Sequence, residues 1–133
     1  MRGATFLLAG LLLPTLAAAE TFGPDSLVIP SDMEWQDAAG LRVHGLVHHL
    51  LREDVPLHWA ILGGKLLNEP DFSASTALWD GSAVQSRGYR SGPWVVAGED
   101  VDADVVALID AWLLLHPDTA VHVAQAPFDA DIE

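Results

Sequence analysis

Residues 26–62 carry the strongest structural signal in the chain: SLVIPSDMEWQDAAGLRVHGLVHHLLREDVPLHWAIL. Two short apolar runs, 26–30 and 57–62, end at a proline and at a pair of glycines, and each predicts a buried strand. Between them apolar residues recur at helical spacing, which predicts a helix over 39–51 with Asp37 as its N-cap. A strand, a helix and a strand in this order predict a βαβ unit with two parallel strands.

The remaining elements extend this pattern into a partial doubly wound α/β fold. Short strands are predicted at 72–77, 83–87, 94–97 and 120–124. A second helix is predicted at 100–115, because acidic residues begin it and Pro117 follows it. We therefore expect a mostly parallel sheet that starts with the βαβ unit and packs against two main helices.

The first 19 residues have the order of a secretory signal peptide. Arg2 precedes an apolar run, and the alanines at 17–19 favour cleavage before Glu20. The apolar run is shorter than the roughly 20 residues that span a bilayer, so we expect no membrane anchor after cleavage. Residues 20–133 have the size of one domain, either complete or the N-terminal part of a longer one. The sequence thus predicts an exported protein that is periplasmic, on the cell surface or extracellular.

The chain is strongly acidic, with 19 Asp and Glu against 6 Lys and Arg and a net charge of −13. Nucleic acids are disfavoured as partners, because their binding depends on cations that neutralise phosphates. The sequence contains no cysteine, which excludes disulfides and thiol chemistry. Five tryptophans in a chain that is 50% apolar indicate a packed globule and not a disordered acidic tail.

The predicted helix at 100–115 is apolar nearly all round. A helix of this kind needs cover on more than one side, and the chain supplies only one other predicted helix. We therefore expect Val106, Leu113 and Leu114 to lie bare in the isolated chain. The partner predicted to cover the helix at 102–115 is a downstream domain or a second subunit.

Several short motifs resemble a family of large exported bacterial proteins of unknown activity that begin with an N-terminal α/β module. The matching positions are LVIP at 27–30 with Asp32, QD at 36–37, GLV at 45–47, LL at 50–51, VP at 55–56 with His58 and Trp59, DF at 71–72 with Ala74 and Ser75, GYR at 88–90 with Gly92 and Pro93, AW at 111–112, and VHVA at 121–124 with Ala126, Pro127 and Phe128. The resemblance covers nearly all of 20–133 and implies that the chain corresponds to the N-terminal part of such a protein. It implies no catalytic residues.

Candidate site residues follow the predicted strands. In parallel α/β sheets ligands bind beyond the carboxyl ends of the strands, where the loops 31–37, 63–65 and 87–92 should gather. Lys65, Arg87 and Arg90 are candidates for clamping an anion such as a carboxylate. The alternative is that these cations pair with the surplus of acidic side chains. Asp32 and His58 are the candidate catalytic acid or base.

We expect no metal site and no cofactor. His44 and His48 lie four residues apart on one helix face, but two ligands do not complete a site. Asp100, Asp102 and Asp104 alternate like the opening of a calcium loop, yet the glycine and the glutamate that such a loop needs are both missing.

Three functions remain open from the sequence. The first is a non-catalytic structural or binding module of a larger secreted or surface protein. The second is a secreted hydrolase or lyase with its site at the strand carboxyl ends. The third is a calcium-dependent extracellular binding domain that relies on the many aspartates.

Overall fold

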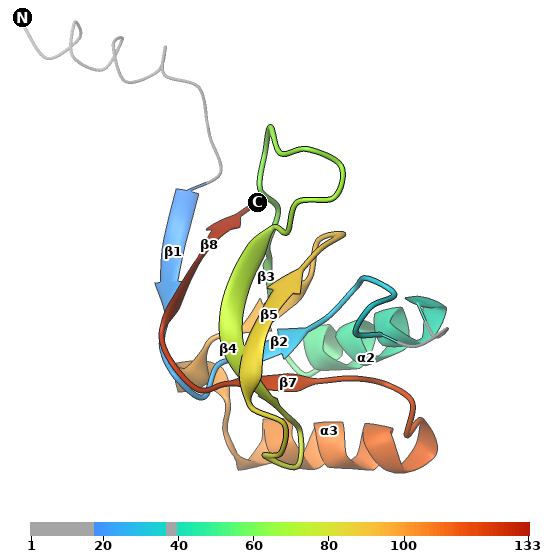
Figure 1. Cartoon of the computed structure of the whole chain (residues 1–133). Helices are drawn as coiled ribbons and strands as arrows, with labels where there is room; N and C mark the ends of the chain where they lie inside the picture. Colours follow the sequence, from blue (N-terminus) through green and yellow to red (C-terminus); the bar gives the residue numbers. More distant parts are fainter. Residues whose placement is uncertain (1–17, 37–39) are drawn as a thin grey trace, which may run out of the picture.

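The computed structural model describes residues 18–36 and 40–133, which form two sheets and two main helices (Figure 1). The strands are β1 (Ala18–Phe22), β2 (Leu27–Ile29), β3 (His58–Trp59), β4 (Phe72–Leu78), β5 (Gln85–Tyr89), β6 (Trp94–Val96), β7 (His122–Ala124) and β8 (Phe128–Ile132). The helices are α2 (Gly40–Arg52) and α3 (Ala103–Leu115), and the 3-10 turn η1 (Gly98–Asp100) precedes α3. The predicted N-cap Asp37 and residues 1–17 of the predicted signal peptide lie outside the described residues.

The prediction of a mostly parallel, doubly wound α/β fold is wrong. One sheet has six strands in the order β3-β6-β2-β7-β4-β5, and the other pairs β1 with β8. Every strand pair within 18–36 and 40–133 is antiparallel. The protein is therefore a mainly antiparallel β structure with two helices.

The main error lies in the pairing of the strands, and the sequence also does not predict β1 and β8, which form the second sheet. β2, α2 and β3 follow one another as predicted, and β2 and β3 run in the same direction because each is antiparallel to β6. However, β6 lies between them, with Val95 paired to both Val28 and His58. Apolar runs show which segments are buried, but they do not show which strands become neighbours.

The six-stranded sheet is covered on both faces. In β2, Leu27 and Ile29 pack toward the two helices, whereas Val28 packs on the opposite face, because successive side chains of a strand alternate. On that opposite face the rings of Phe72 and Phe128 stack with their centroids 5.0 Å apart. Cover on both faces explains why the β2 sequence is apolar throughout.

The predicted strand at 57–62 is split at Ala60. Trp59 pairs with β6, whereas Ala60 forms a bridge to Ile132 of β8. The next backbone N–H, that of Ile61, donates to the carbonyl of Asp131 over 3.0 Å. The segment after β3 therefore turns from one sheet to the other, which ties β1 and β8 to the six-stranded sheet.

The second helix starts later than predicted and has an uncovered side. Residues 98–100 form η1, and Asp102 then caps α3 by accepting the Val105 N–H over 2.9 Å. On α3, Val106 is 37% and Leu114 84% exposed, and Leu113 is half-buried. Within the described residues, no helix has both the length and the apolar character needed to cross a bilayer.

Candidate functional site

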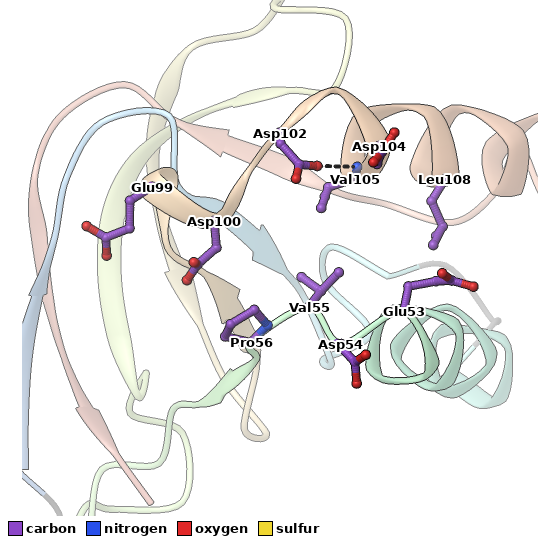
Figure 2. Close-up of a pocket in the computed structure, with 10 residues that line it drawn as sticks. All are labelled: Glu53, Asp54, Val55, Pro56, Glu99, Asp100, Asp102, Asp104, Val105 and Leu108. Carbon is purple, nitrogen blue, oxygen red and sulfur yellow. Dashed lines mark hydrogen bonds between the residues drawn. The ribbon is translucent and has the colours of Figure 1, made fainter.

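A cleft of about 610 Å³ lies between the end of α2 and the start of α3 (Figure 2). Six of its lining residues are acidic: Glu53, Asp54, Glu99, Asp100, Asp102 and Asp104. The other four are apolar: Val55, Pro56, Val105 and Leu108. We call this space the acidic cleft.

Among the described residues, five of the six carboxylates in the acidic cleft have no hydrogen-bond or ion-pair partner. Asp102 caps α3 through Val105, as the dashed line in Figure 2 marks. In the part of the chain that the structure describes, the remaining carboxylates take part in no hydrogen bond and no ion pair with another side chain. All of them except that of Asp100 belong to exposed residues. The cleft therefore presents uncompensated negative charge to solvent.

The end of α2 fixes the position of Asp54. The Val55 N–H donates to the Leu50 carbonyl over 3.0 Å, and the Asp54 N–H donates to the Leu51 carbonyl over 3.1 Å. These two bonds form a Schellman motif, in which the residue in the left-handed conformation is usually glycine. Here that residue is Asp54, with φ 59°. Because the C-terminal end of a helix carries partial negative charge, a carboxylate there favours a nearby cation.

Apolar side chains form the floor of the acidic cleft. Val55 and Val105 are 8% and 4% exposed and belong to the core between the sheet and the helices. In Figure 2 the side chains of Val55 and Leu108 point into the space between α2 and α3. An apolar floor below several carboxylates suits a ligand that has methylene groups and an ammonium or guanidinium head.

The sequence shows the acidic residues of the cleft, but it does not show that they lie close together. The acidic run Asp100, Asp102 and Asp104 predicts the start of a helix, and nothing in the sequence singles out Glu53 and Asp54 as candidates. The available signal was an acidic pair directly after one helix and an acidic run directly before another. Only the packing of α2 against α3 shows that these two segments face each other.

Asp32 holds two loops together. Its Oδ1 accepts the N–H groups of Glu34 and Trp35, at 2.9 and 3.3 Å, and its Oδ2 accepts the Arg90 N–H at 2.8 Å. Both oxygens of this buried carboxylate are therefore occupied by backbone donors. This arrangement favours a structural role for Asp32 over that of a catalytic acid or base.

A hydrogen bond from the Arg90 N–H to Asp32 joins segments 31–36 and 87–92, and Asp71 contacts both Lys65 and Gly92, but the half-buried cations Lys65 and Arg90 are paired with acidic groups. Arg90 Nη1 lies 3.2 Å from Glu34 Oε2, and Arg90 Nε donates to the Asn68 carbonyl over 2.8 Å. Lys65 Nζ lies 2.9 Å from Asp71 Oδ1. These contacts agree with the alternative interpretation, in which Lys65 and Arg90 pair with the surplus of acidic side chains.

Arg87 occupies a different environment from the other two cations. It is buried on β5, donates to the carbonyls of Thr76 and Ala83, and stacks on the Trp35 ring with its guanidinium carbon 5.2 Å from the centroid. Its Nε has no hydrogen-bond partner among the described residues. Nearby, the Tyr89 hydroxyl lies 2.6 Å from Thr76 Oγ1. Burial raises the pKa of Tyr89 to about 12.

The histidines do not assemble into a site. His58 Nδ1 lies 3.7 Å from Glu20 Oε2, and within the described residues no hydrogen bond or ion pair joins His58 to Asp32. The His44 ring packs edge-on against Trp94 at 5.3 Å. Among residues 18–36 and 40–133, no three His, Cys, Asp or Glu side chains are placed to hold a metal ion.

Comparisons with known proteins leave the site without a family context. No protein-family model, no curated protein and no solved structure matches the chain. The resemblance to large exported bacterial proteins therefore stays a prediction, and any function rests on the geometry of the chain itself.

Proposed function

We propose that the chain is a non-catalytic binding module of an exported protein and that it binds a cationic ligand in the acidic cleft. The observation that carries this proposal is the set of five carboxylates above an apolar floor, none of which has a partner in the part of the chain that the structure describes. The ligand class is a primary amine or guanidinium on a flexible aliphatic chain. A lysine-rich or arginine-rich peptide segment has this chemistry.

The competing hydrolase or lyase function has less support. Its two candidate residues, Asp32 and His58, contact different parts of the fold. Neither of them lines the acidic cleft. A binding function does not need an acid and a base that meet at one substrate. It also gives a role to the excess of acidic over basic residues in the sequence.

Isothermal titration with pentalysine tests the proposal. The double variant Glu53→Gln, Glu99→Gln removes two cleft charges whose side chains make no hydrogen bond in the described residues, so the fold should be preserved. Exposed ion pairs contribute about 0.2–1 kcal/mol each, so the dissociation constant should rise roughly 2- to 30-fold. Binding should also weaken as salt is added, because the interacting charges are exposed.

The matched control is Glu133→Gln, which removes an exposed carboxylate outside the cleft. Its affinity for pentalysine should equal that of the unchanged protein. If the control and the double variant weaken binding by the same factor per charge, the peptide senses only the net charge of the protein. That outcome would remove the acidic cleft as a specific site.

Export is part of the proposal and rests on the residue order of the predicted signal peptide. In the structure Ala18 and Ala19 belong to β1 and pair with Ile132 and Asp131. Cleavage before Glu20 would shorten this strand to Glu20, Thr21 and Phe22. N-terminal sequencing of protein recovered outside the cytoplasm should begin at Glu20, and recovery of an intact Met1 there would contradict the cleavage.

A further inference from the structure

The bond at which cleavage is predicted, between Ala19 and Glu20, lies inside a paired strand. In β1, Ala19 stands opposite Asp131 of β8, and Glu20 stands opposite Ala130. Figure 1 shows β1 and β8 running side by side at one side of the fold. In an antiparallel pair the backbone N–H and C=O groups of the two strands bond to each other. In the folded protein the backbone on both sides of the cleavage bond is therefore paired with β8.

Two side chains anchor β1 to β8 just after this bond. Thr21 Oγ1 donates to Asp129 Oδ1 over 2.6 Å. Phe22 is 3% exposed, and its ring stacks on that of Phe128 with the centroids 5.4 Å apart. Residues 18–19, which cleavage would remove, have exposed side chains. These two anchors thus belong to the part of the chain that cleavage would keep.

The partner strand β8 comes late in the sequence. The hydrogen-bonded residues Thr21 and Asp129 are 108 positions apart. Strand pairs between such distant segments form slowly, because a long loop has to close first. A chain that crosses a membrane with its N-terminus first therefore exposes the bond between Ala19 and Glu20 before β8 arrives to pair with β1.

We propose that folding closes the predicted cleavage site, so that the bond between Ala19 and Glu20 is cut only while β1 is not paired with β8. This inference rests on the proposed export of the chain. The step is a hydrolysis, in which water adds across the amide and leaves a carboxylate on Ala19 and an ammonium group on Glu20. A precursor that folds first keeps residues 1–19, because a protease acts on the locally opened form of a folded protein.

The anchor at Phe22 sets the expected size of the effect. Freeing β1 from β8 takes the Phe22 side chain out of the core. Burial of a phenylalanine side chain contributes about a factor of 10 to 150 to such an equilibrium. When opening is fast relative to cutting, the rate of cutting follows the population of opened molecules. The folded precursor should therefore be cut at least about tenfold more slowly than an unfolded chain with the same cleavage site.

Purified signal peptidase and two full-length valine variants test the proposal. Val28→Asp places a charge at a fully buried position of β2 and should unfold the chain. Val84→Asp is the matched change at a valine that is 56% exposed, and it should leave the chain folded. Circular dichroism shows which chains are folded, and mass spectrometry measures the loss of residues 1–19. Val28→Asp should be cut rapidly, and Val84→Asp and the unchanged precursor at least about tenfold more slowly.

The outcomes separate this inference from the prediction of export. A folded, unchanged precursor that is cut as fast as the unfolded variant would overturn the inference and leave the predicted cleavage intact. A Val28→Asp chain that is not cut between Ala19 and Glu20 would contradict the predicted cleavage itself, and the inference with it.

A disulfide tests whether the release of β1 is the step that controls cutting. The double variant Thr21→Cys, Asp129→Cys links two residues that face each other across β1 and β8, and the sequence itself contains no cysteine. At a urea concentration below the unfolding transition, the folded reduced form should be cut measurably and the oxidised form more slowly. Equal, measurable rates for the two forms would show that the bond is cut without release of β1, which would overturn the inference.

Discussion

The hydroxyl oxygen of Tyr89 lies 2.8 Å from Nδ1 of His122, in the covered interior of the six-stranded sheet. Burial, together with the positive charge of Arg87, lowers the pKa of His122 to about 4 from its ordinary value of 6.5. In the unfolded chain this imidazole takes up a proton below about pH 6.5, whereas in the folded protein it stays neutral until about pH 4. Between about pH 6.5 and 4 a proton therefore binds the unfolded chain more readily than the folded protein, which lowers the free energy of unfolding.

Stability should fall as the pH is lowered through this window. Neutral His122 makes its full contribution to the free energy of unfolding above about pH 6.5. This contribution is lost progressively as the pH falls to about 4, and the total loss is about 3 kcal/mol. Urea unfolding at several pH values measures the slope. The variant His122→Gln has no group that titrates there, so the difference between its curve and that of the unchanged protein isolates the effect. Parallel curves would contradict the prediction.

Gly45 is required where α2 meets α3. A Cβ at this position would lie 2.6 Å from Cη2 of Trp112, and the Trp112 ring is also in contact with His49 and His116. Gly45→Ala gains helix propensity, but overpacking costs roughly 1–3 kcal/mol, so we expect a net loss of about 1 kcal/mol in the free energy of unfolding.

Gly63→Ala is the control for this substitution, because a Cβ at Gly63 meets no atom within 4 Å. Urea unfolding of both variants makes the comparison. A Gly45→Ala variant that is more stable than the Gly63→Ala variant would show that Trp112 moves aside without cost, because only the gain in helix propensity would remain.

Asp54 should contribute to binding at the expense of stability. Its φ of 59° is unfavourable for a residue with a side chain, so Asp54→Gly should raise the free energy of unfolding by about 0.5–1 kcal/mol. The same substitution removes a carboxylate from the acidic cleft and should weaken pentalysine binding. Asp54→Asn separates the two effects, because it removes the charge and keeps a residue type that tolerates this conformation. If both variants bind as tightly as the unchanged protein, Asp54 has no part in binding.

The sequence predicts the helices well because their signals are local. The apolar spacing of 39–51 closely matches α2, and α3 ends at Leu115 as predicted, since Pro117 follows shortly after. The sequence predicts a start of α3 that is too early, because Asp100 and Asp102 are both suited to the first turn of a helix. Asp102 is the residue that supplies the cap.

The sheet and the acidic cleft could not be predicted in the same way, because both depend on contacts between distant segments. Because β6 lies between β2 and β3, these two strands are not neighbours, and each pairs antiparallel with β6 instead. Glu53 and Glu99 become neighbours of one cleft only when α2 packs against α3. Asp32 was identified from its position after a strand, but its hydrogen bonds favour a role in joining loops.

The central claim is that the acidic cleft is the binding surface, and chemical-shift mapping of backbone amides with pentalysine tests it most directly. The amides that shift on titration should cluster at residues 53–55 and 98–108, which line and flank the cleft. These shifts should disappear in the Glu53→Gln, Glu99→Gln variant. Shifts spread evenly over the acidic surface, or confined to a region away from α2 and α3, would contradict the central claim.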